Sequence, residues 1–422
     1  MPEEIKSVIT CDLDGKVETF SEGAQDLFGY TREEVIGKVR VSDFSHGEVV
    51  LGHVINWLKI AVEKGAWEGE TVFLDKHKNE IPCRIKITPT KDNEGNHIGY
   101  CGVTERIHDK SPNEVRPKIS FVTKLFKWMV IMRLPFLSAT FVPIFAGAAV
   151  ASMMGFPVSW TWLGITLFAG SLLHIGTNTS NDYFDYKSGT DTINYNYSNE
   201  GLNGGSRSIQ MGLISPKGVA IVAAISFSLS AIVGIPLIIK AGLNILWLGL
   251  FGFLSGLFYT APPFNFSSRR GLGELLIGLN FGPLMAAGSA LVQTGQLLPE
   301  AFLAGIPIGF LIAAVVYINE FPDHDSDKRT GKNTLIVTLG PEKARRGYVA
   351  LFASAFISIV LMAINGIFPV LTLAALAAAY FGINSARTLY KYYNDRLLQS
   401  ANWGTIYMHS AAGFLFCIGI WL

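Results

Sequence analysis

Residues 301–335 read "AFLAGIPIGFLIAAVVYINEFPDHDSDKRTGKNTL", an apolar run followed directly by a charged cluster. The apolar part, 301–317, carries no charged side chain, which is the composition of a helix in the hydrocarbon core of a membrane. The charged part, 318–335, holds four acidic side chains. This order predicts a membrane helix that ends in a polar site at the membrane surface.

The whole chain shows the same division on a larger scale. Its 422 residues are 50% hydrophobic and 16% charged, with a mean hydropathy of +0.35, whereas soluble domains carry about 25% charged residues. Residues 1–120 are polar, and long apolar runs fill 130–422. We therefore expect a multidomain protein, with an α+β domain at 1–110, a linker at 111–127 and an all-α polytopic membrane domain at 128–422. The net charge of +1 gives no reason to expect a nucleic-acid partner.

Nine apolar runs are long enough to cross a bilayer core of about 30 Å as helices. Basic residues are concentrated in the loops on one side of this arrangement, while the loops on the other side carry only Lys240. By the positive-inside rule, the N-terminal domain lies in the cytoplasm and the C-terminus outside. The first thirty residues lack an apolar segment, and the four cysteines show no metal-like spacing, so we expect no secretory signal and a reducing compartment. The predicted spans are 130–154, 158–180, 217–239, 243–261, 272–292, 299–318, 345–365, 367–386 and 403–422.

The N-terminal domain begins with "SVITCDLDGKVETF" at 7–20, in which Asp14-Gly15 predicts a hairpin turn between two strands. Helical patterns and three further strand-like runs follow. This order, with "DGKVETFSEGAQDLFGYTREEVIGK" and the late "DNEGNHIGYCGVTER", resembles a PAS sensor domain, although Ser21 stands where that family usually has Asn. The resemblance implies a domain that binds a small ligand, forms a dimer or acts as a regulatory appendage. For His46 and His53 the alternatives are haem ligands or ordinary surface or core histidines, and the second is more frequent for a lone histidine.

Two acidic clusters, each led by asparagine, end predicted membrane helices on the same cytoplasmic face. The first is "NDYFDYKSGTD", in which Asp182 and Asp185 are three residues apart. The second is "NEFPDHDSD", in which Asp323 and Asp327 are four apart. Either spacing puts two carboxylates on one side of a helix.

The carboxylates of such a cluster repel one another unless a cation lies between them. Hard divalent cations favour oxygen ligands, and Mg²⁺ usually takes one or two carboxylates together with substrate phosphates. Two facing clusters therefore predict a site that holds a phosphorylated substrate through Mg²⁺. The alternative is that each cluster is only solvated charge at a helix end, but two clusters on one face favour the metal–phosphate site.

Basic residues near the clusters are candidates to bind phosphate. The turn Gly204-Gly205-Ser206-Arg207 offers backbone N–H groups and a guanidinium to an anion. For the others the alternative is positive-inside topology alone. They are Lys187, Lys328, Arg329 and Lys332.

Three residues inside or at the ends of the predicted spans carry further hypotheses. Arg133 lies in the first run, where a charge costs at least about 2.5–3.5 kcal/mol, so it either binds an anionic substrate group or reaches the interface. Tyr259 ends the fourth run and either stabilises a cation through its ring or belongs to an aromatic belt. His174, within the second run, is expected to pack or hydrogen-bond.

The stretch from about 125 to 422 resembles the UbiA superfamily of intramembrane aromatic prenyltransferases, on the two motifs "NDYFDYKSGTD" and "NEFPDHDSD". The resemblance implies nine helices and two Asp-rich motifs that bind a prenyl diphosphate through Mg²⁺. It assigns catalysis and metal binding to Asp182, Asp185, Asp323 and Asp327, with Asp191 as a further metal ligand. It assigns diphosphate binding to Asn181, Lys187, Arg207, Asn319, Lys328 and Lys332, and contact with the acceptor or the allylic cation to Arg133 and Tyr259.

Further motifs resemble one branch of this superfamily, the 1,4-dihydroxy-2-naphthoate polyprenyltransferases of menaquinone synthesis. These are the six-residue spacing from Asp185 to Asp191 and the stretches "RLPFLSATFVPIFAG", "GGSRSIQMG", "YTAPPF", "GLGELLIGLNFGP" and "GKNTLIVTLG". Glu320-Phe321-Pro322 departs from that branch, which usually has a basic residue just before the aspartate, and this departure bears on the acceptor. The implied partners are a polyprenyl diphosphate, an aromatic acceptor and membrane lipid, in a multi-pass protein of the cell inner membrane.

Two alternatives differ from this prediction. The acceptor could be another quinone head group or a glyceryl phosphate, with the same reaction type. The chain could instead be a membrane-anchored sensor without catalytic activity, although a scaffold would not need paired Asp clusters. The order of the two domains also suggests that the N-terminal domain regulates the transferase, by sensing a ligand or redox state.

Overall fold

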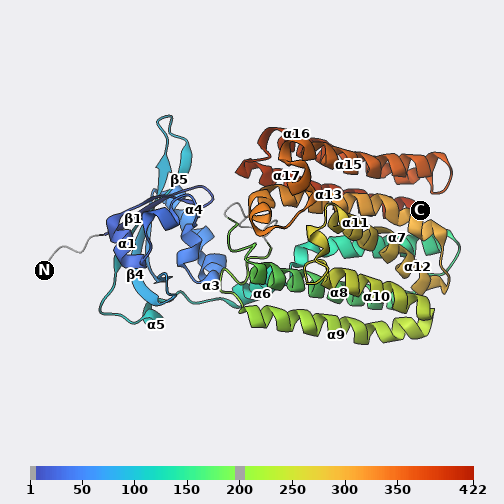
Figure 1. The fold of residues 1–422 in the computed structure, drawn as a ribbon, viewed down its shortest axis with the longest axis horizontal. Coiled ribbons are helices and arrows are strands. Elements are labelled where there is room, and N and C mark those ends of the chain that lie inside the picture. Colours follow the sequence, from blue (N-terminus) through green and yellow to red (C-terminus); the bar gives the residue numbers. More distant parts are fainter. Residues whose placement is uncertain (1–5, 195–204) are drawn as a thin grey trace. The chain divides into compact units, whose positions relative to one another are not determined.

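The computed structural model describes residues 6–194 and 205–422, and the chain divides into two compact units. One unit comprises Met1–Ile131 together with Arg207–Ser215. The other comprises Met132–Ser206 and Pro216–Leu422. The first is built on a β-sheet and the second on long helices (Figure 1).

The N-terminal unit contains a five-stranded sheet of order β2-β1-β5-β4-β3, in which all neighbouring strands are antiparallel. Short helices connect β2 to β3, so strands, helices and three strands follow one another as the sequence predicts. The strands are β1 Ser7–Asp12, β2 Val17–Phe20, β3 Trp67–Leu74, β4 Glu80–Lys91 and β5 His97–Arg106. The helices of this unit are α1 Glu22–Phe28, α2 Arg32–Val35, η1 Val41–Phe44, α3 Gly47–Val49, η2 Val50–Val54, α4 Ile55–Lys64, α5 Pro112–Val115 and α6 Phe121–Ile131.

Local side-chain hydrogen bonds explain where these elements begin and turn. Asp12 Oδ1 accepts from the backbone N–H groups of Asp14 and Lys16, both at 2.9 Å, and Gly15 adopts φ 80°, which confirms the predicted hairpin turn. Ser21 Oγ caps α1 by accepting from the Ala24 N–H group. The hydroxyl of serine thus performs the capping that Asn provides elsewhere.

Aromatic side chains fill the interior of the sheet domain. The rings of Phe20, Phe28, Phe44 and Phe73 are buried and lie 4.7–6.5 Å apart between centroids in four pairs. Of the two candidate haem ligands, one lies beside an acidic side chain and the other beside a backbone carbonyl group. Both therefore fit the interpretation as ordinary, partly buried histidines. His46 Nε2 lies 2.9 Å from Glu80 Oε1, and His53 Nε2 lies 3.1 Å from the carbonyl oxygen of Lys118.

Two cysteines of this domain give a prediction about redox sensing. Cys11 and Cys83 are buried, and burial raises the pKa of each thiol to about 12. At pH 8 only about one thiol in ten thousand is then ionised, and the thiolate is the reactive form. We expect both thiols of the full-length protein to react slowly with 5,5′-dithiobis(2-nitrobenzoate), faster as the pH rises, and about 100-fold faster or more after denaturation in SDS.

Mass spectrometry of the labelled peptides distinguishes these thiols from Cys101, which is less buried and serves as the internal comparison. Rapid labelling of Cys11 and Cys83 at pH 7 would contradict the prediction. The expected result would exclude oxidation of these two thiols as the signal of the N-terminal domain.

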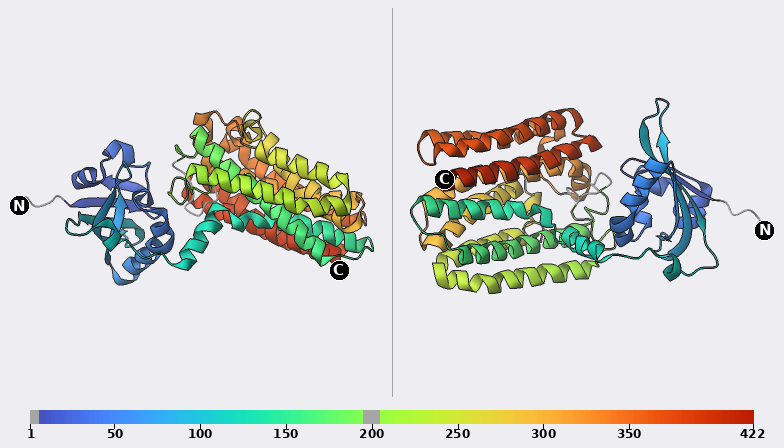
Figure 2. Two further views of the ribbon diagram at one scale, coloured as in Figure 1. Left: turned by 90° about the horizontal axis from the view of Figure 1, so that it is seen from below. Right: turned by 180° about the vertical axis from the view of Figure 1, so that it is seen from behind.

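The membrane unit is a bundle of long helices that run side by side (Figures 1 and 2). More of α13 is buried than of any other apolar span in the described chain, so α13 lies at the centre of the bundle. The helices in order are η3 Leu134–Leu137, α7 Ser138–Met153, α8 Trp160–Ser188, α9 Pro216–Ala241, α10 Leu243–Leu257, η4 Phe266–Ser268, α11 Leu272–Leu279, η5 Asn280–Leu284, α12 Met285–Thr294, α13 Pro299–Thr330, α14 Leu335–Leu339, α15 Pro341–Ile364, η6 Val370–Ala378, α16 Ala379–Tyr392, η7 Arg396–Leu398 and α17 Gln399–Trp421.

Small residues allow α13 to approach its neighbours closely. A Cβ atom on Gly305 would lie 2.3 Å from Pro283 Cα, and one on Gly282 would lie 2.5 Å from the Gly305 carbonyl oxygen. Close backbone approach through small residues is the usual way in which membrane helices pack. By contrast, α9 exposes large apolar side chains such as Ile232 and Ile239, which suits a surface in contact with lipid.

Each of the nine predicted spans is helical, but the boundaries and hydropathy differ from the prediction. In the described residues, seven helical segments are long and apolar enough to cross a membrane, α10 is shorter, and α8 is long but more polar. The predicted linker is also helical, because it contains α5 and most of α6.

One interruption and two ends of the predicted spans differ from the prediction in a way that matters for the site. The first run, 130–154, is interrupted after α6, where Arg133 adopts φ 52°. The second continues to Ser188 and the sixth to Thr330. Both acidic motifs therefore begin within the last turns of helices. Polar side chains are compatible with these turns, because the backbone hydrogen bonds of the helix continue while the side chains face a shared cavity.

Candidate functional site

The first acidic motif occupies the last turns of α8 and the turn that follows. Asp182 and Asp185 are buried on this helix, which ends at Gly189 with φ 82°. Asp182 Oδ1 accepts from the backbone N–H of Ser206 at 3.2 Å. A Cβ atom on Gly205 would lie 2.8 Å from Asp182 Oδ1 and 2.9 Å from Asp191 Oδ2, so this position requires glycine.

The second acidic motif occupies the last turns of α13. Asp323 and Asp327 lie one turn apart, and the helix ends at Gly331 with φ 77°. Asp323 Oδ1 accepts from Asn194 Nδ2 at 2.7 Å. Asp327 is almost completely buried, and the sharp end of the helix turns the chain back so that Lys332 follows directly beside it.

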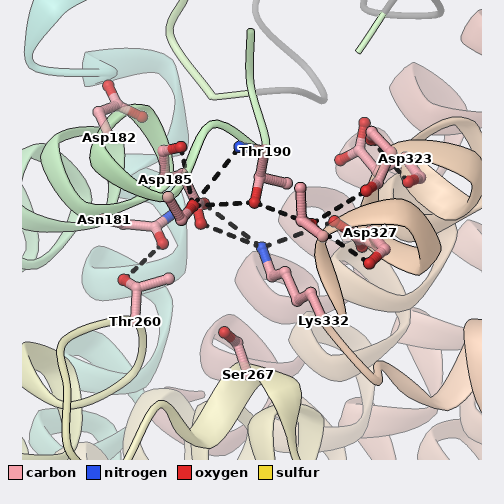
Figure 3. Close-up of polar contacts among 12 residues, drawn as sticks. Asn181, Asp182, Asp185, Thr190, Thr260, Ser267, Asp323, Asp327 and Lys332 are labelled. Atoms are coloured by element: carbon pink, nitrogen blue, oxygen red, sulfur yellow. Dashed lines mark hydrogen bonds and ion pairs between the residues drawn. The ribbon is translucent and has the colours of Figure 1, made fainter. Parts of the chain in front are cut away.

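Lys332 connects the two motifs (Figure 3). Its Nζ lies 3.3 Å from Asp185 Oδ2 and 3.9 Å from Asp327 Oδ1. Burial alone would lower the pKa of Lys332, but the carboxylates of Asp185 and Asp327 raise it well above the usual value for lysine. Thr190 Oγ1 also donates to Thr330 Oγ1 at 3.1 Å. The two clusters, predicted to face one another, thus meet around the partly buried cation of Lys332.

Arg133 reaches the first motif from the break between α6 and η3. Its Nη1 lies 3.9 Å from Asp182 Oδ1, and its guanidinium lies 4.8 Å from the centroid of the Phe136 ring. Arg133 adopts φ 52°, and its side chain is 14% exposed and lines the cavity of the bundle. The hypothesis of a functional intramembrane charge is thereby favoured over snorkelling to the interface.

The two asparagines that lead the motifs are held by other side chains. Thr260 Oγ1 donates to Asn181 Oδ1 at 2.7 Å (Figure 3). Asn402 Nδ2 donates to Asn319 Oδ1 at 2.6 Å. Because each carboxamide oxygen accepts a hydrogen bond, its NH₂ group is directed elsewhere, and both asparagines line the same cavity.

This cavity has a volume of about 710 Å³ and two chemically different ends. The polar end is lined by Asp185 and Asp191 of the first motif, Asp323 and Asp327 of the second, Lys332 and Arg133, and Tyr259 lines the cavity as well. Asp182 is buried but is not one of the lining residues. The other end is apolar and extends between helices of the bundle. Its apolar walls come from α8, α9, α10, α12 and α13, through residues such as Phe227, Leu237, Ile245, Phe253, Met285 and Ile312.

Other predicted residues lie apart from the cavity. Lys187 and Lys328 are exposed at the ends of their helices. Asp325 is also exposed and lies 2.9 Å from His324 Nδ1. Arg207 is buried and begins the segment Arg207–Ser215, which belongs to the N-terminal unit.

His174 lines the cavity and has a structural partner. Its Nδ1 lies 2.8 Å from Thr140 Oγ1, and its ring packs against Phe281. This agrees with the prediction that it packs and hydrogen-bonds.

The donor set fits a magnesium ion that arrives with a diphosphate. Among the described residues, no group of three His, Cys, Asp or Glu side chains converges as a preformed metal centre. Magnesium does not require one, because it typically binds one or two carboxylates and completes its shell with phosphate oxygens and water. Asp182 Oδ2 and Asp327 Oδ1 are buried without a hydrogen-bond partner, which is the condition of carboxylate oxygens available to a cation.

Several residues at the site were not anticipated from the sequence. Thr190, within the first motif, and Asn194, just after it, hydrogen-bond to the last turns of α13, which carry the second motif, but short polar residues in a turn carry no pattern that distinguishes them. Glu274 is different, because it is a charge within the fifth predicted span and is buried there. The argument applied to Arg133 would have found it.

Comparison with known proteins agrees with this architecture. Residues 140–411 match the UbiA prenyltransferase family, and residues 6–107 match a PAS domain. A 1,4-dihydroxy-2-naphthoate octaprenyltransferase of Escherichia coli is 27% identical over 312 residues, which cover 71% of this chain and 97% of the relative. A protein of the same name from Haemophilus influenzae is 32% identical over 257 residues, covering 57% and 78%.

Among solved structures, a UbiA homologue from Archaeoglobus fulgidus bound to GPP and Mg²⁺ is 17% identical, with a TM-score of 0.49. The match covers 69% of this chain and 99% of that one. A PAS domain from Colwellia psychrerythraea is 21% identical and covers 25% of this chain and 88% of that one, with a TM-score of 0.24. Since the family match spans more than half of the sequence, the chain belongs to the UbiA prenyltransferase family.

Proposed function

We propose that this prenyltransferase moves a polyprenyl group from a prenyl diphosphate to an aromatic acceptor, 1,4-dihydroxy-2-naphthoate, with Mg²⁺ as cofactor. The observation that carries the proposal is one cavity with a polar end, where two Asp motifs meet, and a long apolar end. The polar end suits a diphosphate with its cation, and the apolar end suits an isoprenoid chain. The names of the bacterial relatives support the choice of acceptor.

The first step is cleavage of the allylic C–O bond, which leaves an allylic cation and pyrophosphate. Lys332 and Arg133 lie beside the aspartates and are placed to meet the charge that develops on the leaving group. Asp182, Asp185, Asp323 and Asp327, with Asp191, would hold Mg²⁺, which when bound acts as a Lewis acid on phosphate oxygens. Asn181 and Asn319 orient this end of the cavity.

The second step forms a bond between the allylic carbon and an electron-rich ring carbon of the acceptor. The ring then loses a proton, or CO₂ if the attacked carbon carries the carboxylate. Tyr259 lines the cavity beside the polar end, where the face of its ring can stabilise a positive charge. The apolar walls exclude water, which would otherwise capture the cation.

A panel of acceptors tests the proposed substrate. Full-length protein in lipid nanodiscs is given labelled geranylgeranyl diphosphate, Mg²⁺ and one of three acceptors: 1,4-dihydroxy-2-naphthoate, 4-hydroxybenzoate or glycerol 1-phosphate. Labelled lipid product with the naphthoate alone is the expected result. Product with one of the other acceptors instead would assign the same reaction to another substrate, and product with none would contradict the function.

The distribution of basic residues supports placing the N-terminal unit and both Asp motifs on the cytoplasmic side of an inner membrane. The diphosphate head group of the prenyl donor and the acceptor would then reach the polar end of the cavity from the cytoplasmic side. Dimerisation through the sheet domain stays a prediction.

Regulation by the N-terminal domain has a physical route through the loop between α8 and α9. The segment Arg207–Ser215 of this loop packs within the N-terminal unit, where the Gly47 N–H donates to the Met211 carbonyl at 3.1 Å. The preceding residue in the chain is Ser206, whose N–H binds Asp182. A rearrangement of the sheet domain at Gly47 would thus be transmitted along a few residues to a metal-binding carboxylate.

We expect Gly47→Val to disturb this route, because a Cβ at that position lies 2.4 Å from the Met211 carbonyl oxygen. Displacement of the loop should raise the KM for the prenyl diphosphate by about fivefold or more. The control is Gly102→Val, a strand position where an added Cβ meets ordinary contacts. Equal kinetics for both variants and the unmodified protein would refute the route.

A further inference from the structure

Two glutamates, Glu274 on α11 and Glu320 on α13, form a buried carboxyl pair beside the cavity. Glu274 is 5% exposed and Glu320 9%. Glu274 lies close enough to Glu320 to interact with it electrostatically. Neither residue has a role in the proposed handling of the diphosphate.

Of this pair, Glu274 is held by a backbone hydrogen bond, whereas Glu320 lines the cavity. Glu274 Oε1 accepts from the backbone N–H of Leu335, at the start of α14, at 3.3 Å. Glu320 lines the cavity, and its Oε2 is buried without a hydrogen-bond partner. Buried carboxyl oxygens are normally satisfied, so an unpartnered one facing a cavity indicates a donor on the ligand.

The ring of Tyr259 lies next to Gly273, the residue before Glu274. A Cβ added to Gly273, the neighbour of Glu274, would lie 3.2 Å from Tyr259 Cε2, so glycine at that position gives the ring its place. Tyr259 also lines the cavity. Glu320 and Tyr259 therefore line the same cavity, which carries the Asp motifs at its polar end and has apolar walls beyond it.

The chemistry of the substrates indicates which of them supplies the hydrogen-bond donor to Glu320 Oε2. A diphosphate presents negatively charged oxygens, which a carboxyl oxygen repels, and a polyprenyl chain has no hydrogen-bond donor. An aromatic diol has two hydroxyl donors on a flat ring that fits against a tyrosine. We propose that Glu320, supported by Glu274, accepts a hydrogen bond from a ring hydroxyl of the acceptor and so determines which acceptor is bound and how its ring is oriented.

This inference rests on the proposed function and adds a specificity-determining residue to it. Glu320 belongs to the Glu320-Phe321-Pro322 stretch, which departs from the pattern of the resembling branch. The departure therefore falls on a side chain that faces the acceptor region of the cavity rather than on the metal ligands.

The test compares Glu320→Leu and Glu320→Gln with Tyr317→Phe in full-length protein. Tyr317 is a matched control, since it lies one turn earlier on α13, is buried, and donates to the Ala344 carbonyl away from the cavity. We expect Glu320→Leu to raise the KM for 1,4-dihydroxy-2-naphthoate about tenfold or more, while the KM for geranylgeranyl diphosphate stays within twofold. Glu320→Gln keeps the shape and should show a smaller rise, and Tyr317→Phe should leave both values unchanged.

A second readout does not depend on turnover. Binding of the naphthoate to the protein in detergent, without prenyl diphosphate, is followed by tryptophan fluorescence for the free diol and for its two mono-O-methyl ethers. The unmodified protein should bind one ether about tenfold more weakly than the diol, and Glu320→Leu should bind that ether and the diol equally.

Acceptor affinity of Glu320→Leu within twofold of the unmodified protein would overturn the inference, as would equal rises in both KM values. If Glu320→Leu does not fold, Glu320→Gln and the ethers give the same decision. If the unmodified protein neither binds nor prenylates the naphthoate, the proposed function fails first. If the unmodified protein prenylates the naphthoate and the Glu320 variants have the same acceptor KM and affinity, this inference fails and the proposed function stands.

Discussion

Replacing Asp327 with asparagine is expected to lower kcat for prenyl transfer about 10²- to 10³-fold. The carboxylate is buried at the end of α13, and one of its oxygens has no hydrogen-bond partner. Asparagine has almost the same shape but carries no charge, so a cation at this end of the cavity loses an anionic ligand. The loss should be partly compensated when the Mg²⁺ concentration is raised.

The measurement is the rate of labelled product formation at saturating substrates over a Mg²⁺ titration. Asp325→Asn is the control, because Asp325 lies on the same helix but its side chain is 69% exposed. We expect Asp325→Asn to retain the unmodified rate. Undiminished transfer by Asp327→Asn, or an equal loss in both variants, would remove Asp327 from the metal site.

Replacing Lys332 with alanine is expected to lower kcat/KM for the prenyl diphosphate about 100-fold. Its ammonium group lies between Asp185 and Asp327, so it both compensates their negative charge and lies close to the proposed position of the departing pyrophosphate. Alanine would leave these two carboxylates without their shared cation. The acceptor KM should change little, because the acceptor carries no diphosphate.

Steady-state kinetics with each substrate varied in turn would separate the two effects. Lys343→Ala is the control, since Lys343 is an exposed lysine at the start of α15. A Lys332→Arg variant should recover part of the activity because it restores the charge. If Lys332→Ala impaired the acceptor KM as strongly as the donor KM, its role would be general support of the site.

The sequence predicts the membrane helices and the pairing of the two motifs well, because both depend on strong local patterns. Long apolar runs identify the bundle, and three- and four-residue spacing identifies which carboxylates share a helix face. The ends of α8 and α13 were placed too early, since a hydropathy pattern ends at the first charge. The helices themselves continue to glycines that can adopt positive φ.

Contacts between segments distant in the chain could not be predicted. Lys332 was one of several basic candidates, and its position between Asp185 and Asp327 depends on how the bundle brings the end of α13 opposite the end of α8. Lys187 and Lys328 have the same chemistry but face outward. Likewise, nothing local shows that Asn194 reaches Asp323.

Arg133 and Glu274 illustrate what a single charge within an apolar run signifies. Both are buried beside the cavity, although only Arg133 was singled out from the sequence. The cost of placing a charge in a membrane makes every such residue a candidate for function. Applied to all spans without exception, this rule identifies the carboxyl pair as well as the arginine.

The most direct test of the central claim is the metal dependence of prenyl transfer by the full-length protein. Protein in nanodiscs is treated with EDTA, divided, and assayed with labelled geranylgeranyl diphosphate and 1,4-dihydroxy-2-naphthoate with and without added Mg²⁺. The proposed function predicts prenylated naphthoquinol only in the samples that receive Mg²⁺, with loss of activity in Asp327→Asn at the same metal concentration. Equal product with and without the metal, or no product under either condition, would contradict it.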